Sequence, residues 1–353
     1  MCLLAILFAL ERYATALHEL TSRYPDWIAA GKAPAFRATL NRAWSAVGDH
    51  AAAFLDAHPE ASADEVVAAI EELNPSPAPD EYVLSATAVK LDAGTYAISA
   101  SYPHSGTFFV IARDRVRWNI KDLAARHRAR RDEIGYWDWL GFSWGDGPLI
   151  GKLGAMAPGG AGRPRFFVDA FAATFAGGTY QNQFSIWEWD GRDAVPLFIR
   201  SYAASFDTHP IELKPGSVTI YIKGRYRTFF SCGACVEPEM AWTLGVTPAG
   251  VRDRGTKALV PELERVDELW DRVIKGRKTN DIASPRVAAA LRRATKGIDG
   301  LGMLGAWRVI GSGRDRVLDF NADRLDCLQF RFLIGEGSRG LYFKEVEVTD
   351  RCG

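Results

Sequence analysis

Hydrophobic positions recur every three or four residues in the N-terminal part of the chain. From residue 35 to residue 57 they form one stripe, which consists of Phe36, Leu40, Trp44, Val47, Ala51 and Leu55. That spacing puts all six side chains on one face of an amphipathic helix. A second helix is expected after Ser62, because a serine followed three places later by Glu65 is typical of a capping box. The pattern predicts a helical N-terminal segment over residues 1–75.

The periodicity changes after a proline-rich stretch, residues 74–79, which predicts a stiff linker and a domain boundary. From residue 80 to residue 256, short β-branched and aromatic runs alternate with turn residues, as in antiparallel sheets. Asp190-Gly191 predicts a tight hairpin turn, because this dipeptide readily adopts positive φ angles. The strand pairs that we expect are 184–189 with 195–202, 96–101 with 107–112, and 217–223 with 227–231.

A loose repeat runs through this central region. A glycine followed by an aromatic residue recurs about every 41 to 46 residues, at Gly94-Thr95-Tyr96, Gly135-Tyr136, Gly178-Thr179-Tyr180 and Gly224-Arg225-Tyr226. Such a period, with several short strands per unit, is typical of repeated sheets. Through these marks and the Trp187-Glu188-Trp189-Asp190-Gly191 hairpin, the region resembles β-propeller blades. No diagnostic motif accompanies the likeness, so it implies a fold and no activity.

A helical period returns near residue 261 and predicts an α+β domain over residues 257–353. One stripe consists of Leu263, Val266, Leu269, Trp270 and Val273, and Ser284-Pro285 predicts the start of a second helix. Four strands are expected to follow, at 303–310, 316–320, 327–334 and 341–348. The region resembles a shortened nuclear-transport-factor-like cone, which again implies fold only. The whole chain is thus expected to be a multidomain α+β protein.

The N-terminus allows two interpretations. Leu3 to Leu10 is almost entirely apolar, and Ala14-Thr15-Ala16 resembles a signal-peptidase site, so residues 1–16 predict a secretory signal and a periplasmic or secreted protein. The alternative is a mature helix reaching Leu20, which favours a cytoplasmic protein. The apolar run is too short to predict a transmembrane helix.

The cysteines are interpreted together with export. Cys232-Gly233-Ala234-Cys235 lies between two expected strands, and we expect a local disulfide that clamps a turn; a pair of reduced thiols is the alternative. A zinc site would need a second pair or histidines at ligand spacing, which the sequence lacks. Cys327 and Cys352 flank the C-terminal hairpin and are candidates for a second bridge.

The amino-acid composition and the absence of binding motifs limit the classes of partner and cofactor that we expect. Lysine plus arginine and aspartate plus glutamate each number 43, so the formal net charge is zero. That balance gives no whole-chain attraction to nucleic acid. The six histidines form no ligand pair, and neither a phosphate loop nor a dinucleotide fingerprint is present. We therefore expect neither a metal nor a cofactor.

Two sets of residues are candidates for catalysis. Gly141-Phe142-Ser143-Trp144-Gly145 matches the nucleophile-elbow pattern, but a glycine-rich stretch follows where the elbow needs a helix. Ser143 is therefore a weak nucleophile candidate, and a turn serine is the alternative. Glu188 and Asp190 would form a carboxylate pair only if they faced a common cleft.

The leading functional hypothesis is an exported, non-enzymatic binding or interaction protein. Its surface for a protein or small-molecule ligand would consist of aromatic residues of the β region, namely Trp187, Trp189, Tyr180 and Phe229. The alternative is a hydrolase that uses Ser143 or a carboxylate pair.

Overall fold

The computed structural model describes most of the chain. The described residues are 2–29, 33–74, 83–102, 105–114, 117–123, 149–172, 179–205, 211–224, 226–230, 239–294, 296, 302–312, 316–322 and 328–350. Within them, the helices are α1 (Cys2–Ala29), α2 (Ala33–Ala57), α3 (Ala63–Glu71), α5 (Pro261–Ile274) and α6 (Pro285–Ala294). The broad α+β prediction is confirmed, because these helices accompany antiparallel sheets.

Three four-stranded meanders make up the central region of the described chain. The first sheet is β1 (Ser85–Asp92), β2 (Thr95–Tyr102), β3 (Ser105–Asp114) and β4 (Arg117–Asp122). The second is β5 (Leu149–Met156), β6 (Arg165–Ala172), β7 (Thr179–Trp189) and β8 (Ala194–Ser205). The third is β9 (Ile211–Lys214), β10 (Ser217–Ile222), β12 (Met240–Thr247) and β13 (Gly250–Ala258).

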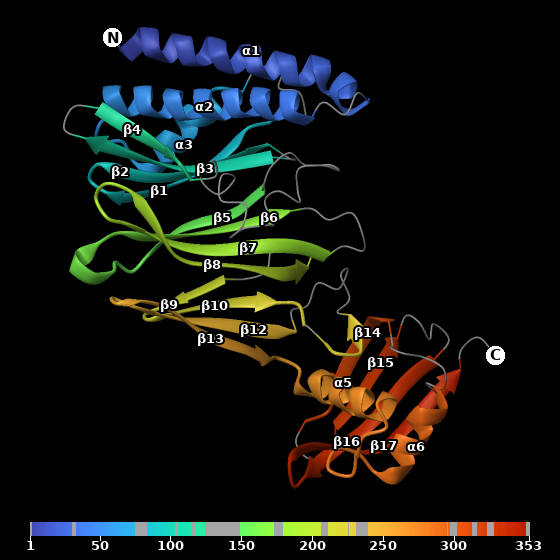
Figure 1. Ribbon diagram of the computed structural model, residues 1–353. Coiled ribbons are helices and arrows are strands. Elements are labelled where there is room, and N and C mark those ends of the chain that lie inside the picture. The colour runs from blue at the N-terminus through green and yellow to red at the C-terminus, as the bar shows by residue number, and fades with distance from the viewer. Residues whose placement is uncertain are drawn as a thin grey trace.

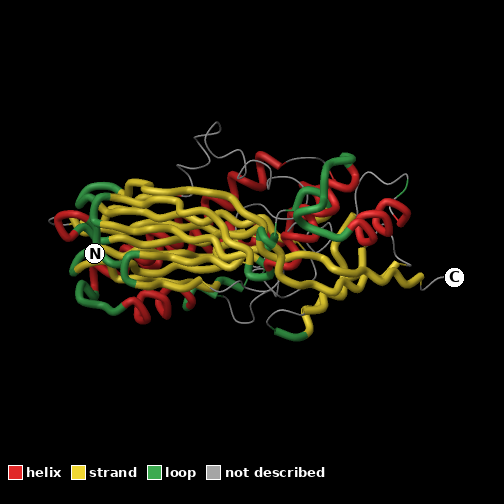
Figure 2. The backbone as a smooth tube through the Cα atoms, turned by 90° about the horizontal axis from the view of Figure 1, so that it is seen from below, coloured by secondary structure: helices red, strands yellow, loops and turns green. Residues whose placement is uncertain are grey.

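These elements form successive layers. Helices α1 and α2 lie above the first sheet, and the second and third sheets follow below it (Figure 1). Seen from below, the strands of these three sheets run along one common direction, and the C-terminal unit lies at one end of them (Figure 2). We call the three sheets the stack.

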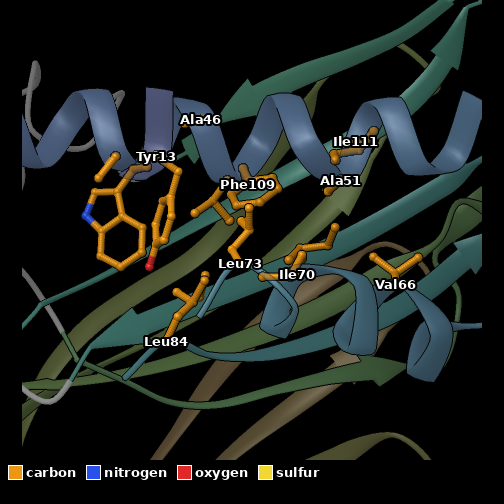
Figure 3. Close-up of a cluster of buried hydrophobic side chains, with 14 of the residues drawn as sticks. Tyr13, Ala46, Ala51, Val66, Ile70, Leu73, Leu84, Phe109 and Ile111 are labelled. Carbon is orange, nitrogen blue, oxygen red and sulfur yellow. The ribbon is translucent and has the colours of Figure 1, made fainter. Parts of the chain in front are cut away.

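The helical segment closes the upper face of the stack. Tyr13 and Leu17 of α1 share one core with residues of α2, α3, β2 and β3. Ala51 of α2 lies close to Ile111 of the first sheet, within this same core (Figure 3). The capping box predicted at Ser62 is confirmed, because the Ser62 side chain accepts from the Glu65 amide and the Glu65 carboxylate accepts from the Ser62 amide.

The first two sheets are buried on both faces. Along β3, Phe109 and Ile111 pack towards the helices, whereas Phe108 and Val110 pack towards the second sheet. A strand with two buried faces needs apolar side chains at consecutive positions, which removes the alternation that marks a half-exposed strand.

The structural repeat is longer than the sequence marks indicate. The sheets begin at Ser85, Leu149 and Ile211, a period of 62 to 64 residues rather than 41 to 46. Tyr96 lies in the second strand of its sheet, whereas Tyr180 lies in the third strand of its own. The glycine–aromatic marks therefore do not occupy equivalent places, and the shorter period is wrong.

A five-stranded sheet and two helices form the C-terminal unit. Its strand order is β11 (Phe229–Phe230), β14 (Gly302–Ile310), β15 (Arg316–Ala322), β16 (Leu328–Gly337) and β17 (Gly340–Asp350). Trp270 of α5 fills the core, with its indole packed edge-on against Phe320, Phe330 and Phe332. The helices and strands predicted for this region are thus confirmed.

The chain crosses from the stack to the C-terminal sheet and back. After β10, Phe229 and Phe230 pair as β11 in parallel with β14, and β12 then returns beside β10. The hairpin predicted between 217–223 and 227–231 is therefore wrong, because β10 pairs with β9 and β12 instead. A domain boundary at residue 257 leaves out this segment, which belongs to the C-terminal sheet.

Candidate functional site

The predicted aromatic surface is buried where the structure describes it. Trp187 and Trp189 are only 3% and 4% exposed, and they lie in the core between the first and second sheets. The Trp187 ring lies 5.8 Å from that of Phe108 in the first sheet. These two tryptophans therefore hold sheets together, and the prediction that they form a binding surface is wrong.

The other two aromatic candidates do not restore that surface. Phe229 is buried in the C-terminal core, with its ring 4.4 Å from that of Tyr226. It therefore belongs to a different sheet from Trp187, and its predicted exposure is wrong. Tyr180 lies in β7, and its side chain is outside the described residues.

Glu188 and Asp190 both have structural partners. The Arg165 Nε donates to Glu188 Oε2 at 2.8 Å, and Arg163 forms a second ion pair with the same carboxylate. Asp190 accepts from the amides of Asp193 and Arg192 in the hairpin turn, which lowers the Asp190 pKa. Hydrogen bonds of this kind stabilise the ionised form. Neither carboxylate has the arrangement of an acid–base pair across a cleft.

The remaining candidates lie outside the described residues. They are Ser143, Cys232, Cys235, Cys327 and Cys352. The nucleophile, the local disulfide and the second bridge therefore stay predictions. Among the described side chains, no group of three or more histidine, cysteine, aspartate or glutamate residues is arranged to hold a metal ion.

A buried polar cluster lies between the second and third sheets. Tyr202 donates to Asp169 Oδ1 at 2.7 Å, and Asn182 donates to the Tyr202 hydroxyl at 3.3 Å. Burial, and next the Asp169 charge, raise the Tyr202 pKa well above its usual value. Tyr202 is thus a neutral donor at physiological pH and a poor base. This cluster anchors the layer and has no evident nucleophile among its members.

A second set of carboxylates binds the segment between β10 and β11, where the chain leaves the stack for the C-terminal sheet. We call this segment the crossover. The Gly224 amide donates to Glu239 Oε2 at 2.7 Å. On helix α5, Asp267 accepts from the Arg227 and Thr228 amides, each at 2.8 Å. Burial, with Glu239 as the second cause, raises the Tyr226 pKa well above its usual value. These acids satisfy backbone donors where the chain leaves one sheet for another.

Among the described residues, the largest cluster of exposed apolar side chains lies on the first turns of α1. Leu4, Leu7 and Phe8 are 76%, 54% and 62% exposed. They lie at positions i, i+3 and i+4, which share one face of a helix. We call these three residues the α1 patch. The signal for this patch in the sequence is the almost entirely apolar run from Leu3 to Leu10. A helix that is apolar on all sides over two turns exposes part of its apolar surface unless another element covers it.

No described helix is long and apolar enough to span a membrane. Comparison with known proteins adds no assignment: no protein-family model matches the chain, and no curated protein matches its sequence.

Proposed function

We propose that this chain is a non-enzymatic interaction protein and that the α1 patch is its contact surface. The observation that carries the proposal is the clustering of Leu4, Leu7 and Phe8 on one exposed helix face. Apolar side chains at i, i+3 and i+4 are the anchors of a helix that docks into an apolar groove of a partner. The expected partner is a protein with such a groove.

The packing of α1 supports this role. On the side of α1 that faces the core, Tyr13, Leu17 and Leu20 are buried in the same core as α2. Arg12 forms an ion pair with Asp49 of α2 at 2.5 Å, and its guanidinium lies 5.8 Å from the centre of the Phe8 ring. The patch therefore stands on a helix that is already fixed, so docking would cost little additional ordering.

The test is site-specific photo-crosslinking in the cells that produce the protein. A benzoylphenylalanine placed at Phe8 is expected to capture one discrete partner, identified by mass spectrometry. The same probe at Thr15, an exposed position further along α1, is the matched control. Leu4→Glu, combined with the probe at Phe8, is expected to abolish the product.

Equal products from positions 8 and 15, or none at position 8, would contradict the proposal. Thermal unfolding of Leu4→Glu separates this result from misfolding, since an exposed substitution should shift the free energy of unfolding by no more than about 0.5 kcal/mol.

Export stays a separate proposal that depends on the same residues. Cleavage after Ala16 would remove the α1 patch and the buried Ala9 and Tyr13. Export by a cleaved signal and docking through the patch are therefore alternatives. The mass of the N-terminal peptide, measured on protein taken from its own cells, decides between them.

The hydrolase alternative has a direct test of its own. A fluorophosphonate probe that labels the wild type but not Ser143→Ala would replace the interaction role with catalysis. Failure of labelling in both proteins leaves the interaction proposal standing.

The finer description of the fold is also a proposal. We infer that the three meanders correspond to propeller-like blades, since each has four strands in sequential or near-sequential order. The C-terminal unit, with α5 and α6 on an antiparallel sheet, supports a cone-like interpretation. Aromatic side chains fill its interior, which argues for a structural role of that core.

A further inference from the structure

The C-terminal sheet has one face that its own helices do not cover. In β15 and β16, Leu318, Phe320, Phe330 and Phe332 point into the core beneath α5 and α6. Because successive strand residues point to opposite sides, Asp319 and Arg331 lie on the other side of the sheet. We call this side the outer face.

A row of alternating charge crosses the outer face. The strand register places Arg308 of β14 beside Asp319 of β15, Asp319 beside Arg331 of β16, and Arg331 beside Glu347 of β17. Across the four strands, the charges therefore read positive, negative, positive, negative. Arg308, Arg331 and Glu347 are exposed.

The row also contains an unsatisfied atom. The Asp319 side chain is 5% exposed, and its Oδ2 binds Arg308 Nη2 at 2.9 Å. Its Oδ1 has no hydrogen bond in the described structure, and Arg331 Nε lies 3.6 Å away, beyond good hydrogen-bond distance. A buried carboxylate oxygen without a hydrogen bond is costly, so a further donor at Oδ1 would stabilise this row.

We propose that the outer face binds a second copy of this chain about a two-fold axis that runs along the strands between β15 and β16. Such a rotation reverses the lateral order of the strands, so that β14 lies over β17 and β15 lies over β16. It leaves the position of each residue along the strand direction unchanged. Arg308 then meets Glu347 of the second copy, and Asp319 meets Arg331 of the second copy. The charge row is thus complementary to itself, which is the property that an isologous interface requires.

The neighbouring row adds apolar contact to the same arrangement. The register aligns Ile310, Val317 and Leu333 across β14, β15 and β16. Under the same rotation Val317 meets Leu333 of the second copy. The fourth position of this row is Glu345 of β17, so Ile310, which is 42% exposed in the single chain, would lie against the side chain of Glu345 of the second copy. An interface built from one charged row and one short apolar row predicts a weak dimer rather than a permanent one.

Charge reversal tests the two-fold arrangement. Sedimentation velocity over a range of concentrations is expected to show a reversible dimer of the wild type that weakens as salt is added. Glu347→Arg places two arginines opposite each other and is expected to weaken the dimer at least ~10-fold, and Arg308→Glu does the same with two glutamates. An equimolar mixture of the two variants is expected to form a heterodimer, because every charge then meets its opposite.

The controls isolate the interface. Arg308 and Glu347 are three strands apart, about 14 Å within one sheet, so their intrachain attraction is screened. Arg192→Glu, in the hairpin turn of the second sheet, should leave dimerisation unchanged. Arg308→Glu also removes the pair with Asp319, so its thermal unfolding is measured, and Glu347→Arg decides alone if that variant does not fold. A wild type that stays monomeric at hundreds of micromolar, a Glu347→Arg variant that dimerises normally, or a mixture without heterodimer overturns the proposal.

Discussion

Phe166 and Phe167 are neighbours in β6, yet each belongs to a different hydrophobic core. Phe166 packs towards the first sheet, and its ring stacks 6.4 Å from that of Trp187 on the neighbouring strand β7. Phe167 packs towards the third sheet, with its ring 5.6 Å from that of Phe184. The second sheet therefore contributes consecutive side chains to two cores. A change in the position of β6 is expected to disturb the packing of both cores.

Gly154→Ala is expected to destabilise the stack. Gly154 pairs directly with Phe167, and a β-carbon at Gly154 would lie 2.4 Å from Phe167 Cε1 and 2.7 Å from its Cζ. Overpacking of this kind costs about 1–3 kcal/mol. Urea unfolding measures the loss.

A double variant makes the cause specific. Leucine lacks the ring atoms that the new methyl group would meet, so Gly154→Ala with Phe167→Leu should lose less than the sum of the single losses. Gly94→Ala is the matched control, since its β-carbon would meet only Arg113 Cβ at 3.4 Å. Full additivity of the two changes would argue against the proposed clash.

Arg165→Met is expected to destabilise the protein by about 3–5 kcal/mol. The Arg165 guanidinium binds Glu188 and also donates to the carbonyl oxygens of Thr247 and Pro248, at 2.6 Å and 3.0 Å. Its loss leaves a nearly buried carboxylate with the exposed Arg163 as its remaining partner in the described structure, and it removes both hydrogen bonds to the turn of the third sheet. Arg163→Met, which removes the exposed ion pair to the same carboxylate, should cost at most about 1 kcal/mol. Equal losses in denaturant titrations would contradict this assignment.

Stability is expected to fall as the pH drops below about 6.5, the ordinary histidine value, in part through His50. Burial lowers the His50 pKa, against the opposing effects of the Ala69 carbonyl and Glu72. The His50 Nε2 donates to Ala69 O at 2.9 Å, and Nδ1 has no hydrogen bond within the described structure. The unfolded chain therefore takes up a proton at a higher pH than the folded chain does.

The sign follows from this difference in proton uptake. The stability is fully present above the pKa of the unfolded chain and is lost progressively down to the lowered pKa of the folded chain. The loss amounts to about 1.4 kcal/mol for each pH unit that separates these two pKa values. His50→Gln retains a donor for Ala69 and should reduce the difference in unfolding free energy between about pH 7.5 and about pH 5.5, which lie on either side of the ordinary histidine pKa. An unchanged difference would assign the acid sensitivity to other groups.

Asp267→Asn is expected to loosen the crossover without unfolding the protein. Asparagine presents an amide donor where the Arg227 and Thr228 amides need two acceptors. Loss of a hydrogen bond to a charged group costs about 1.5–3 kcal/mol, so local amide exchange at these positions should accelerate about 10- to 100-fold. Glu264→Gln, at an exposed position of the same helix, is the control for hydrogen exchange measured by NMR. Unaltered exchange in Asp267→Asn would remove Asp267 from this role.

Local signals in the sequence predicted local structure well. Ser62 and Glu65 predicted a cap that depends only on residues three positions apart, and the cap is present. Asp190-Gly191 predicted a hairpin turn, and Gly191 has a φ of +93° between β7 and β8. Features of this kind carry their cause within a few residues.

The layered arrangement was beyond what such patterns determine. A strand such as β3 has apolar residues on both sides, so periodicity does not indicate which neighbour each face contacts. Trp187 and Trp189 alternate with Glu188 along β7, and this local pattern does not show that both sides of the strand are buried. In the structure Arg165 neutralises Glu188, so both sides of the strand are covered.

Phe229 illustrates a limit of another kind. Its partner strand begins at Gly302, far along the chain, and the pairing is parallel. Adjacent segments in the sequence favoured a hairpin with β10, because local turns are the shortest connection. Long-range packing places β11 in the C-terminal sheet, and no residue near Phe229 in the sequence indicates this pairing.

The detour of the chain through β11 affects how the protein can be made and cut. During synthesis, Phe229 leaves the ribosome long before its neighbour Gly302 exists. Until then the Phe229 side chain has no core in which to be buried, and exposed apolar surface on a nascent chain promotes chaperone binding and aggregation. A truncated product that stops after β13 would keep this problem permanently, whereas the full-length molecule resolves it at its last stage of assembly.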